Sequence, residues 1–392
     1  MTNTSKKKIL WAIPRPFLPV SDGASKANES LLLSFFDNQV LVEGFEVTLL
    51  LFAEDEVDTS LYRKFPVENI VTAKKKTLGS GVKRIIQVLK NFFSDAPVTA
   101  NFFDLNENRF ILENLSHMNF YYILCDGLHP YCGLRKFFKD SHFIYRSHNV
   151  EFDLWNVNDA SPIARFILSQ QQHKMKSLEL ELIERAQAIW CISEEDQKQY
   201  MSIVDNKPIY YLPMALPFED RRKVSTSEDF HFIFVGKLDW HPNTEGLKWF
   251  LDEVAPYLNE NIKVSIVGKG DFPIERYTSL SQVEFIGFVE RLEELYQSCD
   301  ACLIPIFSGS GTRIKVIEAL SYGTPILSTS FGVQGSAMEE GDCFLLDSKE
   351  AWVKELNHWD RKRAQEMASN AQNKLDSLYG YERILSEVSK LK

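Results

Sequence analysis

The stretch Phe307–Gly335, with the sequence FSGSGTRIKVIEALSYGTPILSTSFGVQG, carries the strongest structural signal in this part of the chain. The apolar run Ala301–Phe307 that leads into it predicts a short buried strand. Ser308–Gly311 then predicts a tight loop, and Thr312–Tyr322 predicts a helix that the following glycine and proline would end. The stretch therefore predicts a strand, a glycine loop and a helix, in that order.

The predicted helix begins with two basic residues, Arg313 and Lys315. The free N–H groups and the positive dipole at a helix start favour an anion, so each basic side chain opposes the dipole by about 0.3–1 kcal/mol. A bound diphosphate would explain why both are present. Glu318, three residues after Lys315, could reach hydroxyl groups beyond the phosphates. The pattern predicts a nucleotide-sugar site, and the alternative is a solvated charged helix after a glycine turn.

The full pattern resembles the donor site of retaining glycosyltransferases with the GT-B fold, in particular glycosyltransferase family 4 (glycosyl transferases group 1). It matches a branch with the motif G-S-G-T-R-x-K-x-x-E-A. The resemblance implies that Arg313 and Lys315 contact the donor phosphates and that Glu318 binds the ribose. The usual family pattern has a second Glu eight positions earlier, where this chain has a serine. We therefore expect the loop to hold the sugar through a hydroxyl and backbone amides. The loop residues expected to bind the donor are Ser310, Gly311 and Thr312.

The first half of the chain alternates short apolar runs with helical patterns, which is typical of a doubly wound α/β domain. The predicted strands are Lys8–Ile13, Phe45–Phe52, Tyr121–Cys125 and His142–Ser147. Ligands in such sheets bind at the carboxyl ends of the strands. The residues of interest near these ends are Gly23, Asp126 and His148.

A second α/β unit is predicted in the second half of the chain, with glycines directly after its strands. These glycines predict an open rim, although each can also be ordinary turn punctuation. Asn243 or Thr244 is expected to cap the helix after the first of these strands. The predicted strands are His231–Val235, Val264–Val267, Val283–Ile286 and Ala301–Phe307, and the glycines are Gly236, Gly268 and Gly287.

The predicted architecture is α/β of the GT-B type, with two Rossmann-like domains. We place an N-terminal acceptor domain at residues 1–207, a proline-interrupted linker at 208–228 and a nucleotide-sugar domain at 229–375. The resemblance implies a final helix that crosses back to the first domain. We expect that helix within residues 376–392, at Tyr379–Leu391.

The resemblance also implies roles for residues outside the donor motif. It places His148 beside the donor sugar, so we predict that His148 is catalytic together with Arg313 and Lys315; the alternative is a structural turn residue. It places the loop Asp22–Ser25 near the donor phosphates and the acceptor. The further donor contacts expected are Gly23, Gly236, Lys237 and Gly268. The residues expected on the acceptor side are Asp22, Ser25, Asp126 and Asn149.

The predicted chemistry uses fixed protein charge and neither a metal ion nor a cofactor. Arg313, Lys315, Lys237 and the helix N-terminus would neutralise the departing diphosphate. The resemblance implies retention of configuration, in which that phosphate helps to take the acceptor proton, and we predict no protein general base. The acidic run Glu54–Asp58 lacks the setting of a metal-binding DxD motif. A UDP-sugar is the favoured donor substrate.

Composition limits the classes of function. The 392 residues suffice for two or three domains, and the net charge of −10 argues against general nucleic-acid binding. No apolar run approaches the ~18 residues that cross a bilayer. The apolar run after Lys6–Lys8 is shorter than a signal-peptide core, so we expect a cytoplasmic protein. Cys299 and Cys302 have a metal-like spacing but no second pair nearby, so we expect no zinc or redox site.

The segment Lys74–Phe93 holds six basic and no acidic residues, with apolar residues at helical spacing. It predicts a helix on an anionic membrane surface, near a lipid-linked acceptor, and the alternative is a domain helix whose apolar face belongs to the core.

The function predicted from these patterns is sugar transfer to a glycan or lipid-linked acceptor in surface polysaccharide or glycolipid assembly. The predicted location is the cytoplasm, with the inner face of the cytoplasmic membrane as a second option. Two alternatives remain open. One is a catalytically silent sugar-nucleotide-binding subunit of another transferase. The other is a nucleotide-sugar epimerase, which would need acid–base carboxylates that the sequence around Ser310 does not offer.

Overall fold

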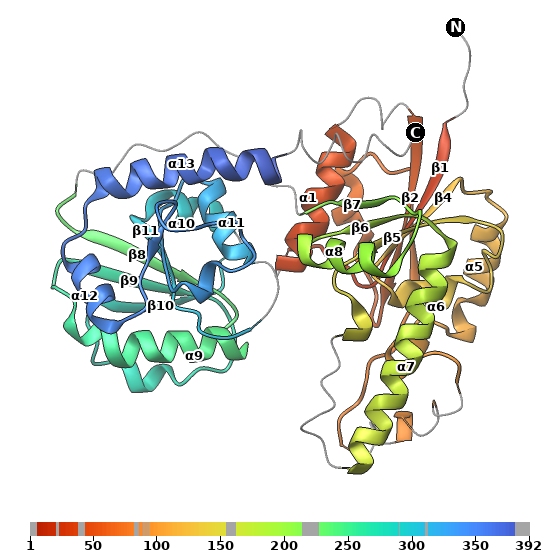
Figure 1. Cartoon of the computed structure of the whole chain (residues 1–392), viewed down its shortest axis with the longest axis horizontal. Helices are drawn as coiled ribbons and strands as arrows, with labels where there is room; N and C mark the ends of the chain where they lie inside the picture. The colour runs from red at the N-terminus through yellow and green to blue at the C-terminus, as the bar shows by residue number, and fades with distance from the viewer. Residues whose placement is uncertain are drawn as a thin grey trace, which may run out of the picture. The chain divides into compact units, whose positions relative to one another are not determined.

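A computed structural model shows two compact units, one running to Met214 and one beginning at Ala215 (Figure 1). The structure describes residues 6–20, 23–37, 44–81, 86–88, 91, 94–153, 162–213, 227–289, 291–309 and 313–380.

The first unit is built on a parallel seven-stranded sheet in the order β3-β2-β1-β4-β5-β6-β7. The strands at the centre are mostly apolar because helices cover both faces of a parallel sheet. The strands are β1 (Lys7–Ile13), β2 (Phe45–Ala53), β3 (Asn69–Lys74), β4 (Tyr122–Asp126), β5 (His142–Ser147), β6 (Ala186–Cys191) and β7 (Ile209–Tyr211).

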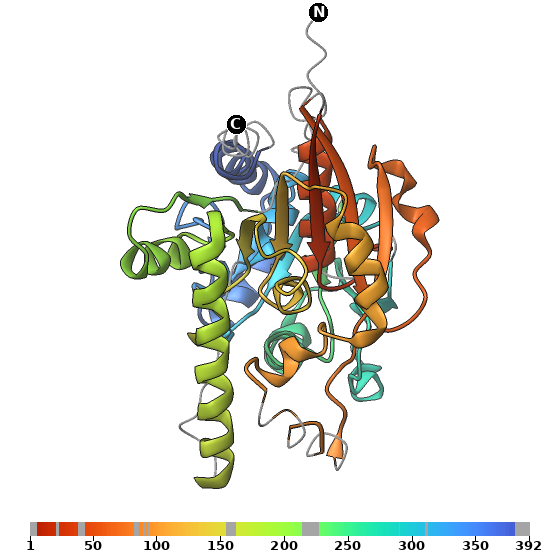
Figure 2. The same cartoon turned by 90° about the vertical axis from the view of Figure 1, so that its right-hand side faces the viewer.

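Alternate residues of these strands face opposite sides of the sheet. Leu10 and Ala12 belong to the core on one side, whereas Trp11 packs edge-to-face on Phe35 of α1 on the other. The long helix α7 extends well beyond the sheet in both views (Figures 1 and 2). The helices are α1 (Gly23–Asp37), α4 (Val98–Asn101), α5 (Arg109–Ser116), α6 (His129–Leu134), α7 (Pro162–Arg185) and α8 (Glu194–Ile203).

The second unit has a parallel six-stranded sheet in the order β10-β9-β8-β11-β12-β13. Figure 1 shows α9 on one side of this sheet and α11 with α13 on the other. The strands are β8 (Phe230–Val235), β9 (Ile262–Val267), β10 (Val283–Gly287), β11 (Ala301–Ile304), β12 (Ile326–Ser328) and β13 (Phe344–Leu345). The helices are α9 (His241–Trp249), α10 (Leu292–Ser298), α11 (Ile314–Ser321), α12 (Lys349–Asn357) and α13 (Arg361–Tyr379).

Each sheet contains one point where the strand order reverses direction, and ligands bind at such points in open α/β sheets. In the first sheet this switch point lies between β1 and β4, and in the second it lies between β8 and β11. The GT-B fold predicted from the sequence is confirmed by these two Rossmann-like sheets and by the structural similarities given below.

Several predicted boundaries were wrong by a few residues. The predicted linker 208–228 begins too early, because Ile209–Tyr211 pairs with β6 as the edge strand of the first sheet. β11 ends at Ile304, since Pro305 has no N–H to continue the ladder. Helix α11 begins at Ile314, so Arg313 precedes its first turn.

Two predicted segments lie partly outside the described residues. The predicted crossing helix Tyr379–Leu391 is described only to residue 380, and Tyr379 is the last residue of α13. The predicted basic helix in 74–93 was wrong in its first part, because Lys74 ends β3 and residues 75–80 are not helical. Further along, Val88 packs against the core and Ile86 is 45% exposed. In the described part of the chain, no helix is both long enough and apolar enough to cross a membrane.

Candidate active site

The switch point of the second sheet brings together the loop after β8 and the segment after β11. Asn243, in the first turn of α9, joins them: its Nδ2 donates to the Lys237 carbonyl oxygen (2.9 Å), and its Oδ1 accepts from Lys315 Nζ (2.6 Å). Asn243 is only 3% exposed. The predicted capping role of Asn243 or Thr244 was wrong, because the helix begins at His241 with Pro242 in its first turn, and both side chains bond back to the preceding loop.

Lys315 lies in the first turn of α11, at the switch point of the second sheet. Its amine also lies over the ring of Phe234, 5.1 Å from the centroid. Burial of the amine lowers the pKa of Lys315 to about 8; nearby Cys302 opposes this shift and Arg313 adds to it. No described carboxylate forms an ion pair with Lys315, so its charge has no compensating acid among those residues.

Arg313 is buried one residue before α11. Its Nη2 donates to the Gly309 carbonyl oxygen (3.0 Å), and its guanidinium lies over the Phe331 ring, 5.2 Å from the centroid. Burial lowers the pKa of Arg313. The guanidinium remains charged at neutral pH, because the ordinary pKa of arginine is above 12. Two cations therefore flank the start of α11, as the sequence predicted.

Glu318 lies one turn further along α11 and is partly exposed. Tyr296 Oη donates to its carboxylate Oε2 (3.4 Å). Burial, together with the nearby charge of Glu318, raises the pKa of Tyr296, so this phenol remains a hydrogen-bond donor. This contact orients the Glu318 carboxylate, and its role in binding ribose remains a prediction.

Close backbone approaches at the same rim leave no room for side chains. A Cβ on Gly236 would lie 2.5 Å from Asn243 Nδ2, and a Cβ on Gly268 would lie 1.8 Å from the Gly236 carbonyl oxygen. A Cβ on Gly246 would lie 1.6 Å from the Pro305 carbonyl oxygen. The absence of a side chain at Gly236 and Gly268 thus allows the strand ends to approach closely. Donor contact by these two glycines remains a prediction.

Lys237 follows Gly236 but is exposed, with its amine 3.9 Å from Asp239 Oδ1. Its phosphate contact remains a prediction. The predicted sugar-binding residues Ser310, Gly311 and Thr312 lie outside the described residues. The same holds for Asp22, whereas Gly23 is the first residue of α1 and Ser25 is buried, 2% exposed.

The first unit contains a buried charge cluster at its own switch point. Arg146 of β5 is in register with Asp126 of β4, and its Nη1 donates to Asp126 Oδ1 (2.8 Å) and to Asn28 Oδ1 (2.6 Å). Burial alone would raise the pKa of Asp126, but the charges and hydrogen bonds of Arg146 and His148 lower it to about 2. Asp126 is therefore a carboxylate at neutral pH.

His148 lies just after β5, and its Nε2 hydrogen-bonds to Asp126 Oδ1. Because Asp126 is ionised, it accepts this bond, so Nε2 carries a proton and Nδ1 is the other ring position available to a ligand. The His148 side chain is 26% exposed, whereas Asp126 is 0% exposed. The prediction that Asp126 faces the acceptor was wrong, because it is buried and orients the imidazole.

The loop after His148 is held by a second buried carboxylate, Glu179 of α7. Glu179 accepts from Tyr145 Oη (2.9 Å), from Tyr200 Oη (2.5 Å) and from the backbone N–H of Phe152 (3.2 Å). The Asn149 carbonyl oxygen accepts from Ser147 Oγ (2.7 Å). These bonds fix the backbone of the loop, and an acceptor contact by Asn149 remains a prediction.

Glu151 in the same loop is a third acid of this region. Burial, together with the negative charges of Glu179 and Asp196, raises the pKa of Glu151 to about 7.

Sequence reasoning missed three residues that build these sites. Asn243 was considered only as a helix cap, and Asn28 and Glu179 were not considered at all. A signal was present for the first-unit cluster, since Arg146 ends a predicted apolar strand and a buried arginine requires an acidic partner. The described residues contain no group of three or more His, Cys, Asp or Glu side chains that could hold a metal ion.

Two sequence similarities were found. Residues 229–359, which include the whole second-unit rim described above, match the family described as Glycosyl transferases group 1. A Klebsiella pneumoniae protein, described as an uncharacterized 44.6 kDa protein in the cps region, is 22% identical over 292 residues. The match covers 69% of this chain and 73% of that protein.

Solved structures share the fold of the whole chain at low sequence identity. Anabaena Alr3699/HepE, solved with UDP and glucose, has a TM-score of 0.64 and 14% identity, with 98% of this chain and 99% of that chain covered. S. aureus TarM, solved as a mutant with Fondaparinux, alpha-GlcNAc-glycerol and UDP, has a TM-score of 0.65 and 11% identity, with 98% and 99% covered. Sucrose-phosphate synthase from Thermosynechococcus elongatus has a TM-score of 0.64 and 15% identity, with 98% of each chain covered. The group 1 match over residues 229–359 and the GT-B fold of the whole chain together support a glycosyltransferase.

Proposed function

We propose that the protein transfers a sugar from a nucleotide-diphosphate sugar, with retention of configuration and without a metal ion, as its resemblance to family 4 implies. The observation that carries the proposal is a pair of cations at the switch point of the second sheet, the buried Arg313 and the partly buried Lys315. Fixed positive charge in a partly desolvated site stabilises a departing diphosphate without reorganisation during the reaction.

We propose UDP as the nucleotide of the donor. The support is that Anabaena Alr3699/HepE was solved with UDP and with UDP-glucose, and S. aureus TarM was solved with UDP. Glu318, oriented by Tyr296, would bind the ribose hydroxyls, and the amides and hydroxyl of the 310–312 segment would hold the sugar.

For His148 we propose contact with the donor sugar during transfer. The Asp126 carboxylate holds Nε2 and so fixes the ring orientation, which supports a positioned hydrogen-bonding group rather than a mobile surface histidine. We propose that the departing phosphate helps to accept the proton of the acceptor hydroxyl. The acceptor would be a glycan or lipid-linked saccharide of surface polysaccharide or glycolipid assembly, handled in the cytoplasm or at the inner membrane face.

The test is a screen of the purified protein against UDP-, GDP-, ADP- and TDP-sugars, with and without EDTA. We expect a thermal shift with UDP-sugars, slow donor hydrolysis that resists EDTA, and a released sugar whose first-formed anomer matches the donor, followed by NMR. Turnover that EDTA abolishes would contradict the metal-independent mechanism, and an inverted anomer would contradict retention.

One observation favours a second candidate, a catalytically silent partner subunit. The chain has Ser310 where the family pattern has a sugar-binding Glu. UDP-sugar binding without hydrolysis, and without transfer to any acceptor in a saccharide panel, would support this candidate over the enzyme.

A further inference from the structure

The first unit contains a pocket of about 230 Å³ at the carboxyl edge of its sheet, at the switch point beside β1. It is formed by the ends of β1 and β3, by the helix α4 and by the start of α6. It is smaller than the ~300–1,000 Å³ of sites that enclose a whole drug-sized ligand, so it suits one chemical group of a larger molecule. The lining residues are Pro14, Arg15, Lys75, Lys76, Thr77, Leu78, Thr99, Phe102, Phe103 and His129.

The walls of this pocket are fixed by specific hydrogen bonds. The buried Asn108 side chain pairs with both backbone groups of Lys74, donating to its carbonyl oxygen (2.7 Å) and accepting from its N–H (2.8 Å). The Lys76 N–H donates to the Phe102 carbonyl oxygen (3.1 Å). Tyr62 Oη accepts from the Phe17 N–H (2.9 Å), which ties down the loop that carries Arg15.

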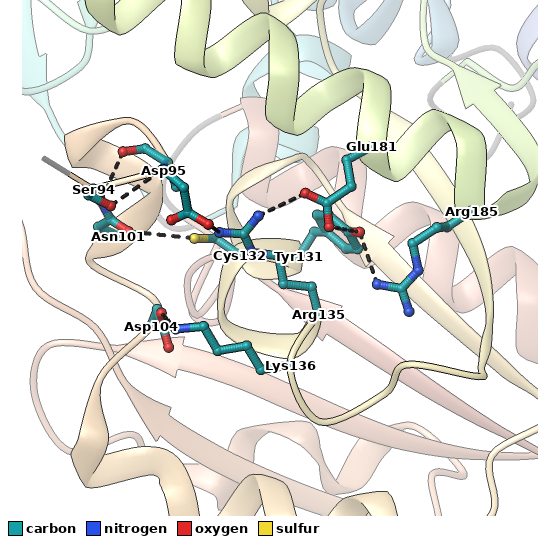
Figure 3. Close-up of polar contacts among 11 residues, drawn as sticks. Ser94, Asp95, Asn101, Asp104, Tyr131, Cys132, Arg135, Lys136, Glu181 and Arg185 are labelled. Carbon is teal, nitrogen blue, oxygen red and sulfur yellow. Dashed lines mark hydrogen bonds and ion pairs between the residues drawn. The ribbon is translucent and has the colours of Figure 1, made fainter.

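A polar network behind the pocket holds its aromatic wall against α6 and α7. Figure 3 shows Arg135 between Asp95 and Glu181, with donor–acceptor distances of 2.7 and 2.8 Å. Glu181 also accepts from Tyr131 Oη (2.7 Å). Lys136 pairs with Asp104, next to the pocket residue Phe103 (Figure 3). The segment that contributes Thr99, Phe102 and Phe103 is therefore anchored at both ends.

The charge of the lining is positive in a protein with a net charge of −10. Arg15, Lys75 and Lys76 contribute three cations, and the lining contains no carboxylate. Acidic neighbours lie outside the lining. Glu54 acts on Lys75 electrostatically and accepts from Thr77 Oγ1 (2.8 Å), and Glu107 is 4.0 Å from the exposed Lys76 amine. Positive charge on a concave surface concentrates anions.

Lys75 is the best-placed cation of the three. Its amine is half-buried and lies over the Phe103 ring, 5.7 Å from the centroid, and no described carboxylate forms an ion pair with it. Burial, with a smaller effect of Arg15, lowers the pKa of Lys75, and Glu54 opposes this shift. A buried amine without a paired anion is unfavourable, so an anionic ligand would remove a cost that the free protein carries.

His129 closes the pocket and links it to the histidine of the candidate active site. Its Nε2 lies 3.1 Å from Thr99 Oγ1. Burial and the nearby charges of Lys75 and His148 lower the pKa of His129 to about 4, so the ring is neutral at pH 7. His129 begins α6 three residues after Asp126, the carboxylate that hydrogen-bonds His148, so the pocket and His148 lie at the same edge of the first sheet.

We propose that this pocket binds a phosphate group on the acceptor substrate, through Lys75, Arg15 and Lys76. This inference depends on the proposed function, because it names the chemistry of the acceptor that the transferase would use. A phosphate dianion matches the several cations better than a single carboxylate does, and the apolar lining beside it suits a phosphate attached to a carbon skeleton. The phosphate could belong to a soluble sugar phosphate or to a phosphorylated lipid.

The direct test measures binding to the full-length protein by calorimetry, without a nucleotide sugar. The probes are glucose 1-phosphate, dodecyl phosphate below its micelle concentration, and glucuronate. We expect at least one phosphate probe to bind, and Lys75→Met to weaken it at least tenfold. Preference for the sugar phosphate would identify a soluble acceptor, and preference for dodecyl phosphate a lipid-linked one; either supports the pocket.

The matched control is Lys74→Met, because Lys74 is an exposed neighbour that does not line the pocket. Lys74→Met is expected to leave phosphate binding unchanged. Arg15→Gln provides a second pocket variant should Lys75→Met unfold, as judged by thermal melting. The proposal is overturned if no phosphate probe binds, if glucuronate binds as tightly, or if Lys74→Met weakens binding as much as the pocket variants do.

The two proposals fail separately. UDP-sugar binding and hydrolysis by the wild-type protein test the proposed function, whereas phosphate-probe binding tests the pocket. Phosphate binding that Lys75→Met abolishes, in a protein that binds no nucleotide, would reject the proposed donor site and leave the pocket standing.

Discussion

The two sheets have the same strand order around their switch points, but they treat positive charge there in opposite ways. In the first unit, Arg146 is buried against Asp126 and Asn28, so its charge is already compensated by the protein. In the second unit, Lys315 donates to the neutral oxygen of Asn243. A compensated cation fixes the positions of its neighbours, whereas a cation with a neutral partner retains charge to offer to a ligand.

The largest effect that this comparison predicts is on stability, from Asp126→Asn. Removing one partner of a buried ion pair leaves the charge of Arg146 uncompensated, so we expect a loss of about 3–5 kcal/mol in the free energy of unfolding. Urea denaturation of the variant and the wild type measures this difference. The control is Asp239→Asn, at an exposed pair in the second unit, which should change stability by less than about 1 kcal/mol. A similar loss in both variants would remove the distinction between the two switch points.

The next effect is on catalysis, from Lys315→Ala. We expect turnover of the nucleotide-sugar donor to fall about 100-fold or more, since a fixed charge on the departing diphosphate is lost. In the wild type, nucleotide binding should also weaken above about pH 8 as Lys315 loses its proton, and this dependence should disappear in the variant. The matched control is Lys354→Ala, on the exposed face of α12. Near-normal turnover in Lys315→Ala would disprove the phosphate assignment.

A smaller effect would come from making the second switch point resemble the first. Asn243→Asp places a carboxylate at the oxygen that lies 2.6 Å from Lys315 Nζ, with almost no change in shape. The new charge pairs with Lys315 and repels phosphate, so we expect the Kd for UDP to rise about tenfold, or about 1.4 kcal/mol. Calorimetry with UDP measures it. Unchanged affinity would mean that Lys315 does not bind phosphate.

The smallest predicted effect concerns Glu151 and pH. Its pKa is raised from an ordinary value of 4.5 to about 7, so the folded state keeps a proton that the unfolded state has already lost between these values. Stability should therefore fall as pH rises from about 5 to 7, by on the order of 1 kcal/mol because the side chain is partly exposed. Melting curves of wild type and Glu151→Gln test this, and equal slopes against pH would contradict it.

Much of the fold could be predicted because its signals are local. Buried parallel strands contain continuous apolar runs such as Ile9–Ile13, and the glycines after β8 and β9 mark the ends of those strands. The edge strand β7 was missed because three residues between prolines carry too weak a pattern, and its pairing with β6 is a tertiary contact.

The candidate site was predictable in part for the same reason. Arg313, Lys315 and Glu318 lie within one short motif, so their spacing suggested contacts to phosphates and hydroxyl groups, and the family resemblance implied the ribose contact. Asn243 contacts Lys315 across 72 residues, and Asn28 contacts Arg146 across 118 residues. Such pairs leave no periodic signal in a single sequence. The role of Asp126 was misjudged because a residue at a strand end can be either buried or exposed. Its contacts with Arg146 and His148, which a single sequence does not show, bury it.

The close contact between Gly246 and the Pro305 carbonyl oxygen has a consequence for protein engineering. The segment from Gly236 to Gly246 and the segment from Pro305 to Lys315 are joined by that contact and by the Asn243–Lys315 bond. Grafting either segment alone from another transferase would place mismatched surfaces against each other. Chimeras that aim to change donor choice should therefore exchange both segments as a single cassette.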